Sequence, residues 1–172
     1  LLNPEALIVL DTMNFWMDNA MDELLKVLKR VDVITINEEE ARQLTGENSV
    51  VLAARKIYKM GPRFVVIKKG EHGVLLFNDE NIFSAPAFPL EKVFDPTGAG
   101  DTFAGGFAGF LTKTNDFSFE NMKLAAIYGS VMASFSVEKF GPECLYNLEA
   151  KEIKNRIKAF RNLTQFQIEF TS

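Results

Sequence analysis

The sequence has few of the residues that build disulfide frameworks and zinc sites. Of 172 residues, one is cysteine (Cys144) and one is histidine, so an internal disulfide and a cysteine-cluster metal site are both excluded. A zinc site would need carboxylates for most of its ligands, which is unusual. No apolar run reaches the ~20 residues of a membrane-spanning helix, and no signal peptide is recognisable. These absences favour a cytoplasmic protein with no membrane partner.

Positive charge is also scarce, since 23 acidic residues outnumber 19 basic ones and the net charge is −4. This balance argues against nucleic acid or an anionic membrane as a partner bound through bulk electrostatics. Apolar residues make up 47% of the chain and charged residues 24%, which is typical of a globular protein. The length suits one domain over residues 1–172. The chain opens on Leu1 and enters a strand-like run at once, so we expect it to be a piece of a longer protein.

Short apolar runs alternate with amphipathic helical patterns. The apolar runs predict strands at 6–11, 31–37, 63–70, 73–79 and 92–95, with an extended edge at 81–88. Helical spacing predicts helices over 18–30, 38–46, 49–61, 101–113, 118–137 and 149–161. The alternation predicts an α/β fold with a mainly parallel sheet flanked by helices. Ligands of such sheets bind beyond the carboxyl ends of the strands, where the polar residues and glycine are Asp11, Asn14, Asn37, Glu40, Gly70 and Asp95.

The stretch "VFDPTGAGDTFAGGFAGFL" (93–111) places an acid, Asp101, inside a glycine-rich turn at the start of a predicted helix. Glycines allow backbone N–H groups to converge on one point, and a helix N-terminus attracts anions. A carboxylate there would repel a resting phosphate, but it suits a base that accepts a hydroxyl proton during phosphoryl transfer. The alternative is that Asp101 only caps the helix.

Other interpretations of this glycine-rich stretch are weaker. A dinucleotide-binding G-x-G-x-x-G is incomplete, because Phe103 occupies the place of the third glycine. The chain has no G-x-x-x-x-G-K-[ST], which excludes a P-loop. Gly105 and Gly109 form a G-x-x-x-G, which we attribute to close packing between helices.

Three segments together resemble the ribokinase-like (PfkB-type) carbohydrate kinase family. "DPTGAGDTFAGGF" (95–107) is similar to the family pattern D-T-x-G-A-G-D-x-F, with Pro96-Thr97 where the family more often has Thr followed by a variable residue. "NEEEARQLTG" (37–46) resembles the family's N-x-x-E segment, and "IKKGEHGVLLF" (67–77) resembles the loop that lies along the nucleotide. The resemblance covers residues 6 to 160 and implies the family's three-layer fold, without the N-terminal part and the β lid.

The resemblance also implies roles for single residues in a kinase that uses ATP and Mg²⁺ on a small-molecule alcohol. Asp101 would be the catalytic base, and the turn at Gly98 with the N–H groups of Ala99, Gly100 and Asp101 would form the anion hole. Asn37 and Glu40 would organise Mg²⁺ through water, and Asp95 would lie near a monovalent-cation site that some members have. The residues implied at the nucleotide are Lys69, Gly70, Gly73, Ala133, Phe140 and Gly141. Asp11 and Asn14 would lie near substrate or phosphate.

Several alternatives stay open at this point. Asn37 with Glu40 also fits a helix capping box without any metal role. The acceptor is a sugar or nucleoside, or the chain is a vitamin kinase for pyridoxal or hydroxymethylpyrimidine. Two further alternatives belong to other classes of protein: a nucleotide-binding module that no longer catalyses, and a dinucleotide-dependent oxidoreductase. The oligomeric state is left open; a homodimer of the full-length protein is one option, because relatives often pair through the lid.

Overall fold

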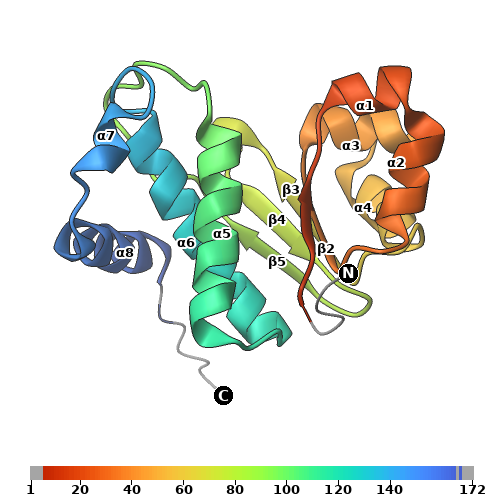
Figure 1. The fold of residues 1–172 in the computed structure, drawn as a ribbon. Coiled ribbons are helices and arrows are strands. Elements are labelled where there is room, and N and C mark those ends of the chain that lie inside the picture. Colours follow the sequence, from red (N-terminus) through yellow and green to blue (C-terminus); the bar gives the residue numbers. More distant parts are fainter. Residues whose placement is uncertain (1–5, 166, 168–172) are drawn as a thin grey trace.

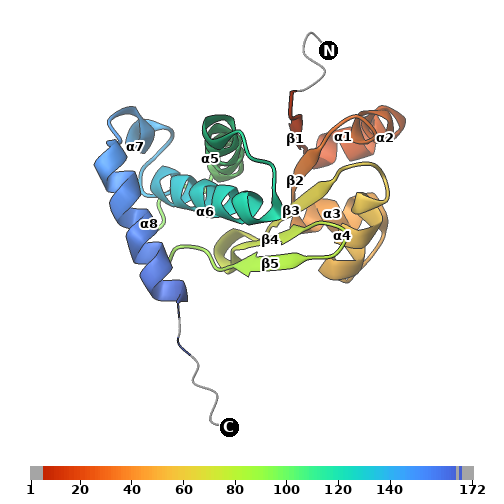
Figure 2. The same ribbon diagram turned by 90° about the horizontal axis from the view of Figure 1, so that it is seen from below.

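The computed structural model describes residues 6–165 and 167, which form one five-stranded sheet between two layers of helices (Figures 1 and 2). The strand order is β1-β2-β3-β4-β5. β1, β2 and β3 are parallel, and β4 and β5 continue the sheet as antiparallel neighbours. The strands are β1 (Val9–Asp11), β2 (Val33–Asn37), β3 (Phe64–Lys68), β4 (Val74–Phe77) and β5 (Ile82–Ala85). The predicted α/β architecture is confirmed, with its parallel part in β1–β3.

Helices cover both faces of the sheet (Figure 1). One face carries α1 (Asn14–Asn19), α2 (Met21–Leu28), α3 (Glu38–Thr45) and α4 (Val50–Tyr58). The other face carries α5 (Ala99–Thr114), α6 (Phe119–Ser136) and α8 (Ala150–Thr164), with the short α7 (Glu143–Tyr146) between the last two. Within the part of the chain that the structure describes, no helix is long and apolar enough to cross a membrane.

The two helical layers explain why the central strands are continuous apolar runs. In β2, Val33 packs into the core under α5 and α6, whereas Ile34 and Ile36 pack into the core under α3 and α4. Side chains of a strand alternate between its two faces. A strand that is covered on both faces therefore needs apolar residues at nearly every position.

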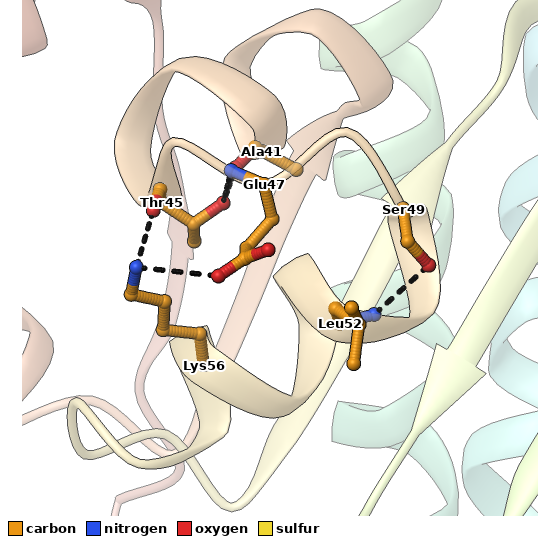
Figure 3. A network of polar contacts seen from close by, with 6 residues as sticks. All are labelled: Ala41, Thr45, Glu47, Ser49, Leu52 and Lys56. Carbon is orange, nitrogen blue, oxygen red and sulfur yellow. Dashed lines mark hydrogen bonds and ion pairs between the residues drawn. The ribbon is translucent and has the colours of Figure 1, made fainter.

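The junction between α3 and α4 shows how local signals fix the end of β2. The Asn37 side chain caps α3, and Gly46 ends the helix in a left-handed conformation (φ 71°). Lys56 then ties the connection to α4: its Nζ donates to the Thr45 carbonyl oxygen at 2.6 Å and lies 3.5 Å from Glu47 Oε1 (Figure 3). The Ser49 hydroxyl caps α4 by accepting from an N–H of its first turn (Figure 3). These contacts hold the capped start of α3 at the carboxyl end of the sheet.

Three sequence predictions about local structure are wrong. The helix predicted over 18–30 is interrupted at Ala20, which separates α1 from α2. Residues 92–95 form no strand: the Phe94 N–H donates to the Val137 carbonyl oxygen at 2.8 Å. The nearby prolines Pro89 and Pro96 lack the N–H groups that a ladder needs, so this segment lies as a loop against the end of α6. Gly105 and Gly109 do not mediate helix packing, because both are exposed with nothing within 4 Å of an added Cβ.

Candidate active site

The site is built on the first turn of α5. Gly98 occupies the N-cap position in a left-handed conformation (φ 76°), which glycine adopts without strain. Its carbonyl oxygen accepts from the Thr102 N–H at 2.9 Å and from the Thr102 hydroxyl at 2.8 Å. Asp101 is the third residue of the helix and is exposed. The interpretation of Asp101 as the helix cap is therefore wrong, because the cap is Gly98.

The backbone of this turn leaves two N–H groups available to an anion. The Ala99 N–H, which was predicted to belong to the anion hole, instead donates to the Pro96 carbonyl oxygen at 3.1 Å. No hydrogen bond among the described residues uses the N–H of Gly100 or Asp101. These two groups lie at the positive end of the helix dipole, where unpaired N–H groups favour an anion.

A cavity of about 640 Å³ lies beside this turn. Five residues predicted for catalysis or nucleotide binding line it together: Gly70, Gly73, Ala99, Gly100 and Ala133. Most of the remaining wall is apolar and includes Phe88, Leu90, Val93, Phe103 and Val137. A second cavity, of about 600 Å³, contains the predicted residues Asn37 and Lys69 and shares Lys68 and Gly70 with the first. The two cavities thus meet at the end of β3.

The turn between β3 and β4 requires its glycine at position 73. Residues Gly70–His72 form a single 3-10 turn, and Gly73 follows with φ 92°. A Cβ at Gly73 would lie 2.1 Å from the Ala85 carbonyl oxygen, closer than any side chain allows. The backbone of β5 therefore approaches the turn directly, which brings the turn to the edge of the cavity.

Asn37 and Glu40 form a complete capping box. The Glu40 N–H donates to Asn37 Oδ1 at 2.8 Å, and the Asn37 N–H donates to Glu40 Oε2 at 3.0 Å. Burial raises the pKa of the Glu40 carboxyl above its ordinary value, although the Asn37 N–H and the Lys68 ammonium oppose this shift. The cap interpretation is thus confirmed as geometry, while the metal role stays a prediction.

The acidic residues near the site suit an ion that is bound mainly through other ligands. The described residues contain no group of three or more acidic, histidine or cysteine side chains that could hold a metal by themselves. Mg²⁺ is commonly bound by one or two carboxylates together with substrate phosphates and water. Glu40, with one carboxylate oxygen engaged by Asn37, fits such an indirect role.

The remaining predicted residues lie outside the lining of the larger cavity. Phe140 is 78% exposed. Hydrogen bonds from the backbone N–H and then the hydroxyl of Thr97, with a smaller contribution from the Gly141 N–H, lower the pKa of Asp95. This contact brings Asp95 and Gly141 together from distant parts of the chain. Asn14 is exposed at the start of α1.

Sequence reasoning missed the residue that joins the two cavities. Lys68, rather than its neighbour Lys69, ends β3 and forms an ion pair of 2.7 Å with Asp11, which ends β1. A signal was available, because a lysine that closes a buried strand needs a counter-charge, and Asp11 lies at the same edge. The apolar wall from the loop over 87–93 was also missed, since no periodicity marks a loop.

Comparisons with known proteins agree with this geometry. A family model described as pfkB family carbohydrate kinase matches residues 5–146. A cytidine kinase of Thermococcus kodakarensis is 45% identical over 88 residues, which are 50% of this chain and 31% of that protein. The structure of a ribokinase from Thermotoga maritima superposes with a TM-score of 0.72 at 28% identity, over 90% of this chain and 50% of that one.

A second solved structure, from E. coli, carries the provisional name ribokinase II and was determined in complex with ATP and Mg²⁺. Its TM-score is 0.74 at 23% identity, over 90% of this chain and 49% of that one. The chain spans about a third of the length of the curated relative and about half of each solved one.

Proposed function

The chain belongs to the pfkB family of carbohydrate kinases, and from this membership we propose that it forms the nucleotide-binding and catalytic part of a small-molecule kinase. The kinase transfers the γ-phosphate of Mg·ATP to a primary hydroxyl of a sugar or a nucleoside. The observation that carries the proposal is the turn at Gly98, which leaves the N–H groups of Gly100 and Asp101 without a partner among the described residues while Asp101 stays exposed beside them.

The cavity supports a nucleotide as one substrate. Its volume of about 640 Å³ lies within the range of small-molecule sites, and its mostly apolar wall with few polar groups suits a flat base. The polar end of the cavity, at Gly70 and Gly100, suits the phosphates. The complex of the E. coli relative with ATP and Mg²⁺ supports the same pair of ligands here.

Asp101 is the proposed base. In a loose transition state the acceptor proton need not leave before the bond to phosphorus forms, so the reaction does not require a strong base. The N–H groups of Gly100 and Asp101 then stabilise charge on the transferring group.

Mg²⁺, when bound, neutralises charge on the phosphates. Glu40 and Asn37 at the end of β2 are the residues proposed to hold it, through water. The hydrogen bond from the Thr97 N–H lowers the pKa of Asp95. Asp95 is proposed to lie near a monovalent cation.

The names of the relatives support a sugar or nucleoside acceptor. The T. kodakarensis relative is a cytidine kinase and the T. maritima neighbour a ribokinase, and both names denote substrates with a ribose ring.

The test is ADP formation by the full-length protein with Mg·ATP and a panel of sugars, nucleosides and vitamin alcohols. Asp101→Asn is expected to lower kcat by ~10²–10⁴-fold while ATP binding, measured by calorimetry, is largely kept. Asp22→Asn is the matched control, because Asp22 is an exposed acid in the first turn of α2. Turnover that survives in Asp101→Asn contradicts the proposed base. A wild-type protein that binds ATP but phosphorylates nothing on the panel would favour a non-catalytic nucleotide-binding module.

A further inference from the structure

Lys68, the last residue of β3, carries a charge that the reaction proposed above does not use. Along β3, Phe64 and Val66 belong to the core under α5 and α6, whereas Val65 and Ile67 belong to the opposite core. Because strand side chains alternate between faces, Lys68 lies on the α5 side of the sheet. Its side chain is only 16% exposed, and it lines both cavities.

Asp11 holds the Lys68 ammonium in one place. Lys68 Nζ donates to Asp11 Oδ1 at 2.7 Å. The same carboxylate oxygen accepts a hydrogen bond of 2.6 Å from the Thr35 hydroxyl. Asp11 and Thr35 are paired across the adjacent parallel strands β1 and β2, and Thr35 is fully buried. A carboxylate fixed by a buried hydroxyl cannot swing away, so the ammonium is fixed with it.

The fixed ammonium lies against the first turn of α5. A Cβ built on Gly100 would lie 3.2 Å from Lys68 Nζ. The N-terminus of a helix repels cations, although the carboxylates of Asp11 and Glu40 attract the ammonium. An anion beside Gly100 would be attracted both to the helix N-terminus and to the ammonium. A multiply charged anion would therefore fit between Lys68 and the helix N-terminus.

The hydrogen-bonding capacity of Lys68 agrees with such an anion. An ammonium group carries three N–H donors. Among the contacts of residues 6–165, Nζ uses one of them, in the bond to Asp11. The other two can donate to phosphate oxygens, next to the backbone N–H groups of Gly100 and Asp101. A tetrahedral phosphoryl group matches donors that converge from two sides.

We propose that Lys68 binds the terminal phosphate of the nucleotide and that Asp11 is the positioning residue that holds it there; this inference rests on the kinase function proposed above. In the transfer, the acceptor oxygen forms a bond to the γ-phosphorus while the bond from that phosphorus to the bridging oxygen breaks. ADP leaves with the electron pair, and the hydroxyl proton passes to Asp101. Lys68 neutralises charge on the oxygens of the transferred group.

Calorimetric binding of ATP and AMP to full-length Lys68→Met tests the inference. We expect ATP affinity to fall by ~10-fold or more and kcat/KM by ~10²-fold, whereas AMP affinity stays within about twofold because AMP lacks the terminal phosphate. Lys26→Met is the matched control: it removes the same charge from an exposed pair with Glu23 on α2. Equal loss of ATP and AMP affinity, or no loss of either, overturns the inference. If Lys68→Met does not fold, Lys68→Gln keeps a donor for Asp11 and undergoes the same measurement.

Asp11→Asn tests the positioning role. We expect it to weaken ATP affinity less than Lys68→Met does, and the double variant to be no weaker than Lys68→Met alone, because Asp11 acts through Lys68. Additive losses would contradict the positioning role. The two proposals fail in different ways: a wild-type protein without turnover rejects the kinase function, whereas an active wild type with an unchanged Lys68→Met rejects only the role of Lys68.

Discussion

Gly129 of α6 lies so close to Phe103 of α5 that a Cβ on Gly129 would be 2.8 Å from the Phe103 carbonyl oxygen and 3.0 Å from its ring. Phe103 also lines the larger cavity. A second glycine repeats the contact one turn further along α5, where a Cβ on Gly106 would lie 2.8 Å from the Met132 side chain. The helix that carries the Gly98 turn is thus held against α6 through backbone surfaces, which leaves little freedom to move it.

We expect Gly129→Ala to destabilise the protein, because the new methyl group meets backbone rather than a flexible side chain. Overpacking of this kind costs about 1–3 kcal/mol in the free energy of unfolding, measurable by urea denaturation. Gly105→Ala is the matched control on α5. Gly105 is exposed and has no atom within 4 Å of an added Cβ, so this change should stabilise the helix by about 0.5–1 kcal/mol. Equal effects of the two variants would contradict the tight packing of α5 on α6.

Gly100→Ala should affect phosphate binding and not stability. The only atoms within 4 Å of its added Cβ are Nζ and Cε of Lys68, so the new methyl group would press on the ammonium and not on backbone. Displacing the ammonium by a few tenths of an ångström and narrowing the anion site should lower kcat/KM by about 10–100-fold. The measurement is kcat/KM for ATP beside the midpoint of urea unfolding. A loss of stability as large as that of Gly129→Ala would show that Gly100 is structural.

Glu40→Gln should change how stability depends on pH. Burial raises the pKa of Glu40 in the folded protein above its ordinary value of 4.5. In the pH range between the ordinary pKa and the raised pKa, the folded protein therefore binds more protons at this residue than the unfolded chain does. The free energy of unfolding contributed by this group therefore falls as pH rises through that window. Glutamine keeps a carbonyl oxygen for the Asn37 N–H and removes the titration.

The measurement is the difference in unfolding free energy between Glu40→Gln and wild type, followed from pH 4 upward. We expect the difference in unfolding free energy to shift in favour of Glu40→Gln as pH rises. We also expect the turnover of Glu40→Gln at low Mg²⁺ to be lower than that of the wild type. Glu152→Gln is the control, since Glu152 has the same place in the capping box of α8 but is exposed. A difference that moves in favour of wild type with rising pH would contradict burial as the dominant influence on Glu40.

The parts that the sequence predicted well are those that local chemistry determines. Asn37 and Glu40 fixed the start of α3, and Ser49 fixed that of α4, because capping depends on residues three positions apart. The glycine turn was placed correctly, but its cap is Gly98 rather than an acid. The backbone there needs a positive φ, and that requirement outweighs the capping preference of Asp101.

The parts that the sequence did not reveal depend on distant segments. Lys68 and Asp11 are 57 positions apart, and only the register of three strands brings them together. Gly106 packs against α6, where Gly105 and Gly109 were expected to pack. Tertiary structure, and not the spacing of glycines, decides which face of α5 meets α6. The prediction of a strand at 92–95 was wrong because a short apolar run is as compatible with a loop that packs on α6 as it is with a strand.

Arg156 of α8 supports a wall of the larger cavity, and its replacement by methionine should weaken that wall. Its guanidinium donates to both carboxylate oxygens of Glu138 at 3.0 Å and to the Ser134 hydroxyl at 3.1 Å, and lies 3.6 Å from the centroid of the Phe135 ring. Ser134 lines the cavity. Arg156→Met leaves Glu138 unpaired near the end of α6, at a cost of about 1–3 kcal/mol in unfolding free energy.

Arg156→Met should weaken the binding of both nucleotides, whereas Lys68→Met should weaken that of ATP alone. Because Arg156 supports the end of α6 and does not contact the first turn of α5, ATP and AMP should lose affinity by the same factor, so that their ratio is unchanged. Calorimetry with both nucleotides measures that ratio. Arg161→Met on the same helix is the control, as Arg161 is exposed. A selective loss of ATP affinity would mean that Arg156 influences the phosphate end, and the division of the cavity into a base wall and a phosphate end would then be wrong.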